Sequence, residues 1–272
     1  KVTIKVSFTG LDDVAGPTTT QQITVANGTT TPTTTKPNTP PPANAVMGGD
    51  VYGAVDASGE AYMCSLGFNG TDASGHTVNI TAGHCDPNDP AAAGTPDAST
   101  AHTVVGNAPG DRFGTFAKTV KGPLDHAVIK IDDNSAKRFQ NNYVRVPGKA
   151  PLAITGVATP MVGQPVCFSG SITGYHCGKV KSTDAAAANY GDVNRGKTTS
   201  SICALSGDSG GVLVTGTMAL GIASQNNGMR DQQMCDEFNA DPAISDFDKP
   251  TLITTPIVSI LKNNPGLKVR TN

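Results

Sequence analysis

Short apolar runs separated by turn-forming residues recur along most of this 272-residue chain. The runs are rich in β-branched residues and are shorter than the helices of an ordinary globular domain. They occupy residues 77–81, 127–131, 165–168, 211–214 and 220–223. This pattern predicts an all-β fold, built as an antiparallel sandwich or barrel.

One segment near the C-terminus has a helical period instead. Ile257, Ile260 and Leu261 form an apolar stripe, and Pro256 suits the first turn of a helix. Thr255 can cap its start, and the Asn-Pro-Gly sequence at 264–266 ends it. Because no other segment has this period, we predict a single helix, placed after the strands.

Residues 1–45 differ in character from the rest of the chain. Residues 1–8 alternate between apolar and polar, which predicts a strand, and residues 21–25 can pair with it in a hairpin. The following stretch is dense in Thr and Pro and has no apolar period, so it predicts an extended linker. The chain thus divides into a strand pair or pro-segment remnant at 1–26, a linker at 27–45 and a folded domain at 46–272.

Composition and charge exclude several classes of function. Charged residues make up 15% of the chain and the net charge is −2, so nucleic acid and anionic membranes are not expected partners. No apolar run reaches the roughly 18 residues of a membrane-spanning helix. No signal sequence is evident at Lys1, so we expect the numbering to begin after its removal or within a trimmed chain.

Six cysteines, an even number, favour disulfides and an oxidising, extracellular setting. The alternative is a cytosolic protein with buried free thiols. Because the chain has no Cys-x-x-Cys sequence, we expect no zinc site and assign no metal or cofactor.

Two short sequences carry the candidate chemistry: Thr-Ala-Gly-His-Cys at 81–85 and Gly-Asp-Ser-Gly-Gly at 207–211. A serine hydroxyl is a poor nucleophile near pH 7 unless an imidazole removes its proton and a carboxylate orients that imidazole. Glycines beside Ser209 allow a sharp turn that aims backbone N–H groups at a developing oxyanion. We therefore predict that Ser209 is a nucleophile and His84 its general base.

These sequences resemble those of chymotrypsin-like serine proteases, in particular the secreted bacterial branch that includes alpha-lytic protease and the streptogrisins. Three further stretches carry the resemblance: Cys-Ser-Leu-Gly-Phe-Asn at 64–69, the Cys167 to Gly178 loop, and Ala-Leu-Gly-Ile-Ala-Ser at 219–224. The match runs from about Val46 to the C-terminus. It implies two six-stranded Greek-key β-barrels that divide near residue 150, and a secreted, monomeric serine endopeptidase acting on protein or peptide substrates without a cofactor.

In such a fold the triad carboxylate lies between His84 and Ser209 in sequence, where the candidates are Asp111, Asp125, Asp132 and Asp133. Asp125 fits best, since it directly precedes an apolar strand, which is also where the family places its aspartate. Asp132 and Asp133 follow that strand and indicate a solvated turn. The resemblance also assigns the oxyanion hole to the backbone N–H groups of Gly207 and Ser209.

The six cysteines allow fifteen pairings, and sequence alone does not choose among them. Their order and spacing favour neighbouring pairs, and the resemblance implies the same pattern. The expected disulfides are Cys64–Cys85, Cys167–Cys177 and Cys203–Cys235.

The resemblance places the substrate pocket between two segments: Ala204 with Leu205, and Ala223, Ser224, Gln225 and Asn226. These segments are uncharged and contain small residues, which favours a large apolar side chain at P1. The acidic stretch at 236–248 lies beside the pocket and indicates a solvated loop, with attraction of basic substrates or a weak calcium site as the alternative.

Asp208 lacks the partner that close relatives supply, because Phe168 stands where they have an arginine. A buried aspartate needs a partner, so we expect another cation to pair with it, with Arg112, Arg138, Arg145 and Arg195 as candidates. A further candidate is the amine of Val46, because the sequence that it begins resembles a mature N-terminus. The hypothesis is a zymogen activated by cleavage after Ala45; its alternative is a retained N-terminal extension.

A second class of function is a catalytically silent, protease-like binding or structural module, with the Thr/Pro segment as a tether. The presence of His84, Asp125 and Ser209 together argues against it. Gln225 and Asn226, where the family has small residues, argue for it, and so does the N-terminal extension.

Overall fold

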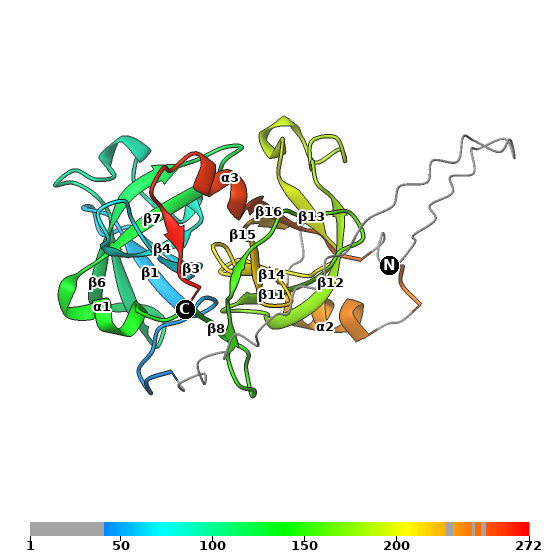
Figure 1. Cartoon of the computed structure of the whole chain (residues 1–272), viewed down its shortest axis with the longest axis horizontal. Coiled ribbons are helices and arrows are strands. Elements are labelled where there is room, and N and C mark those ends of the chain that lie inside the picture. Colours follow the sequence, from blue (N-terminus) through cyan, green and yellow to red (C-terminus); the bar gives the residue numbers. More distant parts are fainter. Residues whose placement is uncertain (1–40, 227–230, 241–242, 246–248, 272) are drawn as a thin grey trace, which may run out of the picture. The chain divides into compact units, whose positions relative to one another are not determined.

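The computed structural model of the chain describes residues 41–226, 231–240, 243–245 and 249–271. Strands are the main regular elements among these residues and form two large sheets (Figure 1). The strand pair predicted within 1–26 and most of the predicted linker lie outside the described residues.

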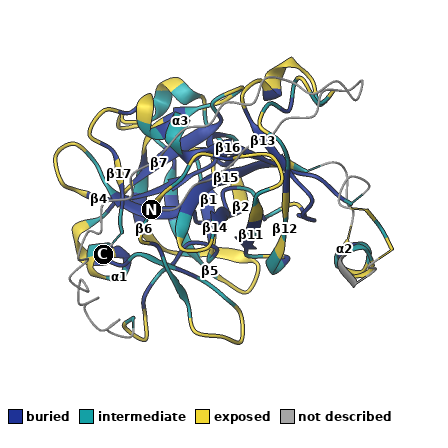
Figure 2. Cartoon of the chain, turned by 45° about the vertical axis from the view of Figure 1, so that its right-hand side comes forward, coloured by how far each residue is buried: buried dark blue, intermediate teal, exposed yellow. Residues whose placement is uncertain are grey.

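The first sheet has eight strands in the order β17-β3-β4-β7-β6-β5-β1-β2. The strands are β1 (Val51–Val55), β2 (Ala61–Ser65), β3 (Phe68–Thr71), β4 (Thr77–Thr81), β5 (Thr100–Val105), β6 (Ala108–Val120), β7 (His126–Ile131) and β17 (Lys268–Val269). β17 pairs antiparallel with β3, so the C-terminal end of the chain returns to the sheet formed by the first half (Figure 2).

The second sheet closes into a six-stranded barrel. Its order is β10-β15-β14-β11-β12-β13-β16, and a further pairing of β15 with β16 joins the ends of the six long strands. The strands are β10 (Gly156–Val157), β11 (Pro165–Gly170), β12 (Gly174–Ser182), β13 (Thr198–Ser200), β14 (Val212–Thr215), β15 (Met218–Asn226) and β16 (Leu252–Pro256). A small sheet of β8 (Tyr143–Val144) and β9 (Leu152–Ala153) lies between the two in sequence. The predicted all-β architecture is confirmed: the second sheet is a closed six-stranded barrel, and the first has eight strands where six were expected.

The predicted C-terminal helix is present as α3 (Ile257–Lys262), with Ile257 and Ile260 buried. Its cap is different from the predicted one, because Pro256 holds the N-cap position and gives it no side-chain hydrogen bond. The Thr255 hydroxyl is buried and donates to the backbone oxygen of Asp125 at 3.0 Å. Thr255 therefore connects β16 to the loop that carries Asp125, and its predicted capping role is wrong.

Two further helices were not predicted. Asp132 is the N-cap of α1 (Asp133–Phe139), so the predicted solvated turn is a short helix, anchored by the buried ring of Phe139. α2 (Gln232–Ala240) occupies the first part of the stretch expected to be an acidic loop, and its Cys235 is buried. Only one or two of the described side chains in each helix are buried, so the sequence shows no apolar stripe with a helical period. Single 3₁₀ turns lie at η1 (Gly83–Cys85), η2 (Pro90–Ala92) and η3 (Asp192–Asn194).

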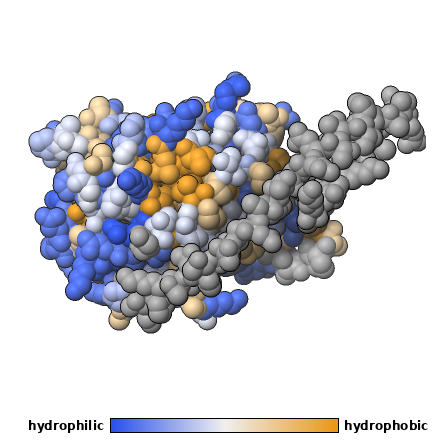
Figure 3. All heavy atoms as spheres, in the orientation of Figure 1, coloured by the Kyte–Doolittle hydropathy of each residue, from blue (hydrophilic) through white to orange (hydrophobic). Residues whose placement is uncertain are grey.

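The larger apolar core draws side chains from both sheets. It contains Ile80 of β4 and Phe116 of β6 together with Val212 of β14 and Ile222 of β15. A second core, which includes Phe168 and Leu213, fills the second barrel. Apolar residues thus gather mainly inside, and the face seen in Figure 3 is largely hydrophilic around one compact apolar area. Because the two sheets share a core, a site between them can combine residues from both.

Candidate active site

His84, Asp125 and Ser209 form one continuous line of hydrogen bonds. His84 lies on η1, Asp125 directly before β7, and Ser209 shortly before β14, so both barrels contribute. The Nδ1 atom of His84 is 2.7 Å from Oδ2 of Asp125, and its Nε2 atom is 2.8 Å from Oγ of Ser209. The other carboxylate oxygen of Asp125 accepts the backbone N–H of His84 at 2.9 Å.

Glycines make this approach of the two loops possible. A Cβ atom on Gly83 would lie 2.0 Å from the backbone oxygen of Val120. Gly210 has a φ of +85°, and a Cβ there would lie 2.1 Å from Oγ1 of Thr81. A larger residue beside His84 or Ser209 would therefore push the reacting side chains apart.

The environment of Asp125 favours its ionised form. Its side chain is buried, and burial alone raises the pKa of a carboxyl. Hydrogen bonds and the charge interaction with His84, together with a hydrogen bond from Ser224, outweigh that effect and lower the pKa of Asp125. An ionised Asp125 accepts a hydrogen bond from the Nδ1–H group of His84, which leaves Nε2 unprotonated and able to accept the Ser209 proton.

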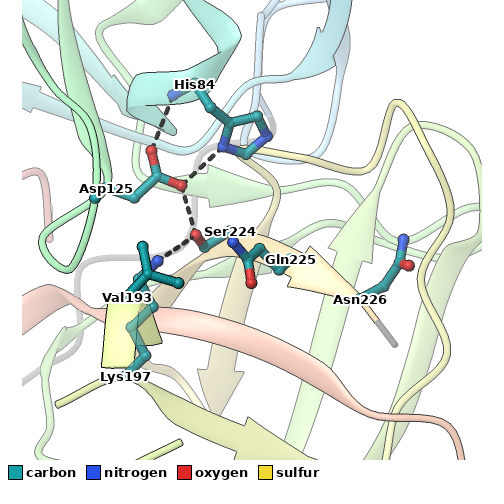
Figure 4. Close-up of a pocket in the computed structure, with 8 residues that line it drawn as sticks. His84, Asp125, Val193, Lys197, Ser224, Gln225 and Asn226 are labelled. Atoms are coloured by element: carbon teal, nitrogen blue, oxygen red, sulfur yellow. Dashed lines mark hydrogen bonds and ion pairs between the residues drawn. The ribbon is translucent and has the colours of Figure 1, made fainter. Parts of the chain in front are cut away.

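Ser224 and Lys197 extend the line on the far side of Asp125 (Figure 4). The hydroxyl of Ser224 donates to Oδ2 of Asp125 at 2.5 Å and accepts a hydrogen bond from Nζ of Lys197 at 2.9 Å. Sequence reasoning assigned Ser224 only to the pocket wall and missed Lys197, because a single lysine between Gly196 and a polar strand carries no recognisable motif. Both residues line a hollow of about 380 Å³ together with His84, Gly122, Asp125, Val193, Gln225 and Asn226.

The backbone turns sharply at Gly207, beside Ser209. Gly207 has a φ of +98°, and its carbonyl accepts hydrogen bonds from the hydroxyls of Ser65 at 2.8 Å and Ser171 at 3.1 Å. The N–H groups of Gly207 and Ser209 donate to no other group in the described part of the chain. They are therefore available to an oxygen bound beside the Ser209 hydroxyl.

Asp208 is fully buried, and its partners are neutral. Its Oδ1 accepts the backbone N–H groups of Ile172 at 2.9 Å and Thr173 at 3.1 Å, and its Oδ2 accepts that of Leu205 at 2.8 Å. The expectation of a cationic partner is thus wrong, because hydrogen bonds from three backbone N–H groups stabilise the buried carboxylate in place of a cation.

The four arginines considered for Asp208 are engaged elsewhere. Arg112 pairs with Asp132 at 3.1 Å, Arg145 with Asp50 at 2.7 Å and Arg195 with Asp192 at 2.6 Å. The Nε atom of Arg138 donates to the backbone oxygen of Asn44 at 3.1 Å. Phe168, which replaces the arginine of close relatives, is buried in the core of the second barrel.

Val46 is also held away from the proposed activating role. Its N–H donates to the backbone oxygen of Arg138 at 2.9 Å, and its carbonyl accepts the side-chain amides of Asn69 and Asn141. Ala45, on the other side of the candidate cleavage bond, is buried. Since Asp208 is already satisfied, the hypothesis that a freed Val46 amine pairs with it is wrong.

The expected substrate pocket is a narrow hollow beside Ser209. Its lining comprises Ala204, Leu205, Asp208, Ser209, Ala223, Gln225, Asn226 and Leu252. The hollow measures about 20 Å³, which is close to the space that one water molecule needs. The predicted wall segments are thus brought together, and they leave little room between them.

Three disulfides join Cys64 to Cys85, Cys167 to Cys177 and Cys203 to Cys235. The last of these packs against Leu205, next to the loop that carries Ser209. Within the described residues, no group of three or more His, Cys, Asp or Glu side chains could hold a metal ion. The same residues include no helix long and apolar enough to cross a membrane.

Known proteins with similar sequences are bacterial serine proteases. Serine protease 2 of Streptomyces fradiae is 37% identical over 188 residues, which cover 67% of this chain and 95% of that protein. Streptogrisin-C of Streptomyces griseus is 32% identical over 67% of this chain but only 35% of its own length. Glutamyl endopeptidase 2 of the same species is 33% identical over 66% of this chain and 85% of its own length.

Solved structures with a similar fold include the Nocardiopsis protease NAPase and the chymotrypsin of Cellulomonas bogoriensis. Each is 26% identical, and the similarity covers 84% of this chain and all of the other, with TM-scores of 0.59 and 0.57. The sequence pattern of the trypsin family matches residues 51–239. The chain therefore belongs to the trypsin family and is a serine endopeptidase related to the streptogrisins.

Proposed function

We propose that Ser209, His84 and Asp125 are the catalytic triad of this endopeptidase. The observation that carries the proposal is the unbroken line of hydrogen bonds from Oδ2 of Asp125 through His84 to Oγ of Ser209. In this role His84 is the general base and Asp125 keeps its imidazole in the reactive tautomer.

The reaction then proceeds in two halves. Oγ of Ser209 attacks the carbonyl carbon of the peptide while its proton passes to Nε2 of His84, and the new oxyanion is bound by the N–H groups of Gly207 and Ser209. His84 next gives the proton to the leaving amine as the C–N bond breaks, which leaves an acyl-enzyme. A water molecule then attacks the acyl carbon while His84 takes its proton. The ester bond to Oγ of Ser209 breaks, the acid leaves, and His84 returns the proton to Oγ.

The pocket beside Ser209 supports specificity for an apolar P1 side chain. Ala204 and Ala223 line it, and the Asp208 carboxylate has its oxygens engaged by backbone N–H groups, so no charge is free to pair with a charged P1 side chain. The large apolar P1 residues expected from the sequence enter a 20 Å³ hollow only if its walls separate. In matched peptides, kcat/KM for Leu or Phe at P1 should exceed that for Arg or Glu by about 100-fold or more. A preference for Arg or Lys would contradict this assignment.

Covalent labelling tests the triad directly. A fluorophosphonate probe should label the wild-type protein at Ser209 with loss of peptidase activity, while the Ser209→Ala variant should stay unlabelled. Ser206→Ala is a matched control, since that serine lies in the same loop without a triad contact, and its variant should still be labelled. Absence of labelling in folded wild-type protein would favour the silent binding module instead.

Secretion is part of the same proposal. Its support is the three disulfides, which persist in oxidising compartments, and the relation to the streptogrisins.

A further inference from the structure

Lys197 is one of the largest fully buried side chains in the described part of the protein, with 1% of its surface exposed. A lysine is almost never buried to this extent unless a partner holds its charge. Within the described residues, Lys197 forms no ion pair with a carboxylate, taking 4.0 Å as the limit. The one hydrogen bond of its side chain with a described residue runs from Nζ to Oγ of Ser224 at 2.9 Å.

The backbone on both sides of Lys197 is fixed. Its N–H donates to the carbonyl of Asn194 at the end of η3, and its own carbonyl accepts the N–H of Ala185. β13 begins at the next residue, Thr198. The side chain therefore starts from a defined position and reaches Ser224 in line with Asp125, as Figure 4 shows.

The direction of the hydrogen bonds follows from the number of protons. An ammonium group can only donate, so the Ser224 oxygen accepts from Lys197. The single hydroxyl proton of Ser224 is then left for Oδ2 of Asp125, which lies 2.5 Å away. One hydroxyl group thus separates a buried cation from the carboxylate that orients His84.

We propose that Lys197 is a positioning residue of the active site: through Ser224 it orients and charge-balances Asp125, and it thereby sets the pH range in which His84 acts as a base. This inference rests on the proposed triad. Imidazolium at His84 would be a second cation near the same carboxylate, so the ammonium of Lys197 disfavours it. Removing the charge of Lys197 should therefore make His84 easier to protonate.

Two opposing effects act on the charge of Lys197. Burial lowers the pKa of Lys197 from its usual 10.5, and the charge of Asp125 opposes that effect. Other titratable or charged groups lie on the elements around His84 and Asp125, and they are unchanged when Lys197 alone is replaced. They are Asp86 after η1, His126 on β7, Lys118 on β6, Tyr52 on β1 and Asp208 in the Ser209 loop.

The test is the acid limb of the pH profile of kcat/KM, measured on the full chain. Lys197→Met removes the charge and keeps the length of the side chain. Its acid limb should move up by about half to one pH unit, and kcat at the plateau should fall by about 2- to 10-fold with KM nearly unchanged. Lys197→Arg keeps the charge and should keep the limb near its wild-type position. Lys121→Met, which removes an exposed lysine bonded to the carbonyl of Asn88, should leave the profile unchanged.

A second measurement does not depend on turnover. An NMR titration of the His84 ring should give a higher pKa in Lys197→Met than in the wild type, and this holds even for protein that hydrolyses no peptide. Thermal unfolding of each variant checks that it is folded. If folded Lys197→Met titrates and reacts with the wild-type pH dependence, the inference is overturned while the triad stands. If wild-type activity does not require Ser209, the proposed function fails, and the NMR titration still decides the role of Lys197.

Discussion

Asp125 and Asp208 are both buried near the active site, and the protein satisfies these two aspartates in different ways. One oxygen of Asp125 accepts hydrogen bonds from two side chains, His84 and Ser224, with Lys197 behind Ser224, while its other oxygen accepts the backbone N–H of His84. Asp208 accepts three N–H groups of the backbone. Side-chain partners allow charge to move during a reaction, whereas peptide N–H groups are fixed by the fold. In the proposed mechanism, Asp125 therefore serves the chemistry and Asp208 holds the shape of the Ser209 loop.

The largest effect is expected from removing Ser209 or His84, the two residues that the hydrogen bonds connect to Asp125. Ser209→Ala and His84→Ala should each lower kcat by about 10⁶-fold, because neither residue has a function without the other. The double variant should be little worse than either single one. If the fold-loss of the double variant in single-turnover assays equals the product of the two single fold-losses, the two residues act separately.

The next largest effect is a loss of stability on replacing Asp208, which distinguishes its role from that of Asp125. Asp208→Asn puts an amide NH₂ where a carboxylate oxygen now accepts a backbone N–H, so the unfolding free energy should fall by about 3 kcal/mol. Urea unfolding measures this loss. Asp192→Asn, an exposed aspartate on η3, is the control and should change stability by less than about 0.5 kcal/mol. A near-neutral Asp208→Asn would mean that the loop does not depend on its carboxylate.

A smaller effect should come from His126, the residue that follows Asp125. Its ring is buried, and desolvation lowers its pKa from 6.5 although the carbonyl of Leu124 and the amide of Asn264 oppose that effect. The unfolded chain therefore takes up a proton near pH 6.5 before the folded chain does. Stability should be full above that pH and should fall below it, by up to about 1.4 kcal/mol per pH unit.

His126→Gln should flatten this dependence in urea unfolding measured between pH 7 and 5. The matched control is His76→Gln, since His76 is exposed and lies far from Asp125 in the first sheet's β3–β4 turn. An unchanged slope in His126→Gln would assign the acid sensitivity to other groups.

Local sequence predicted the frame of the site well. β4 and β7 were predicted from their apolar runs, and the Gly-rich context of His84 and Ser209 indicated two residues that the fold brings to 2.8 Å. Partners contributed by peptide N–H groups leave no mark on side-chain composition, so the neutral environment of Asp208 could not be predicted. Lys197 could not be predicted for a related reason. It directly precedes β13, Ser224 lies on β15, and the two residues come together only because both strands pair with β16.

The most direct test of the central comparison measures kcat and unfolding free energy together for Asp125→Asn and Asp208→Asn. The account predicts that Asp125→Asn lowers kcat by about 10⁴-fold, because the amide no longer holds His84 in the tautomer that has its proton on Nδ1. Its loss of stability should be smaller than that of Asp208→Asn. Asp208→Asn should lose more stability and far less kcat in its folded fraction. Equal losses of kcat in the two variants, or an Asp125→Asn enzyme that retains most of its activity, would contradict the account.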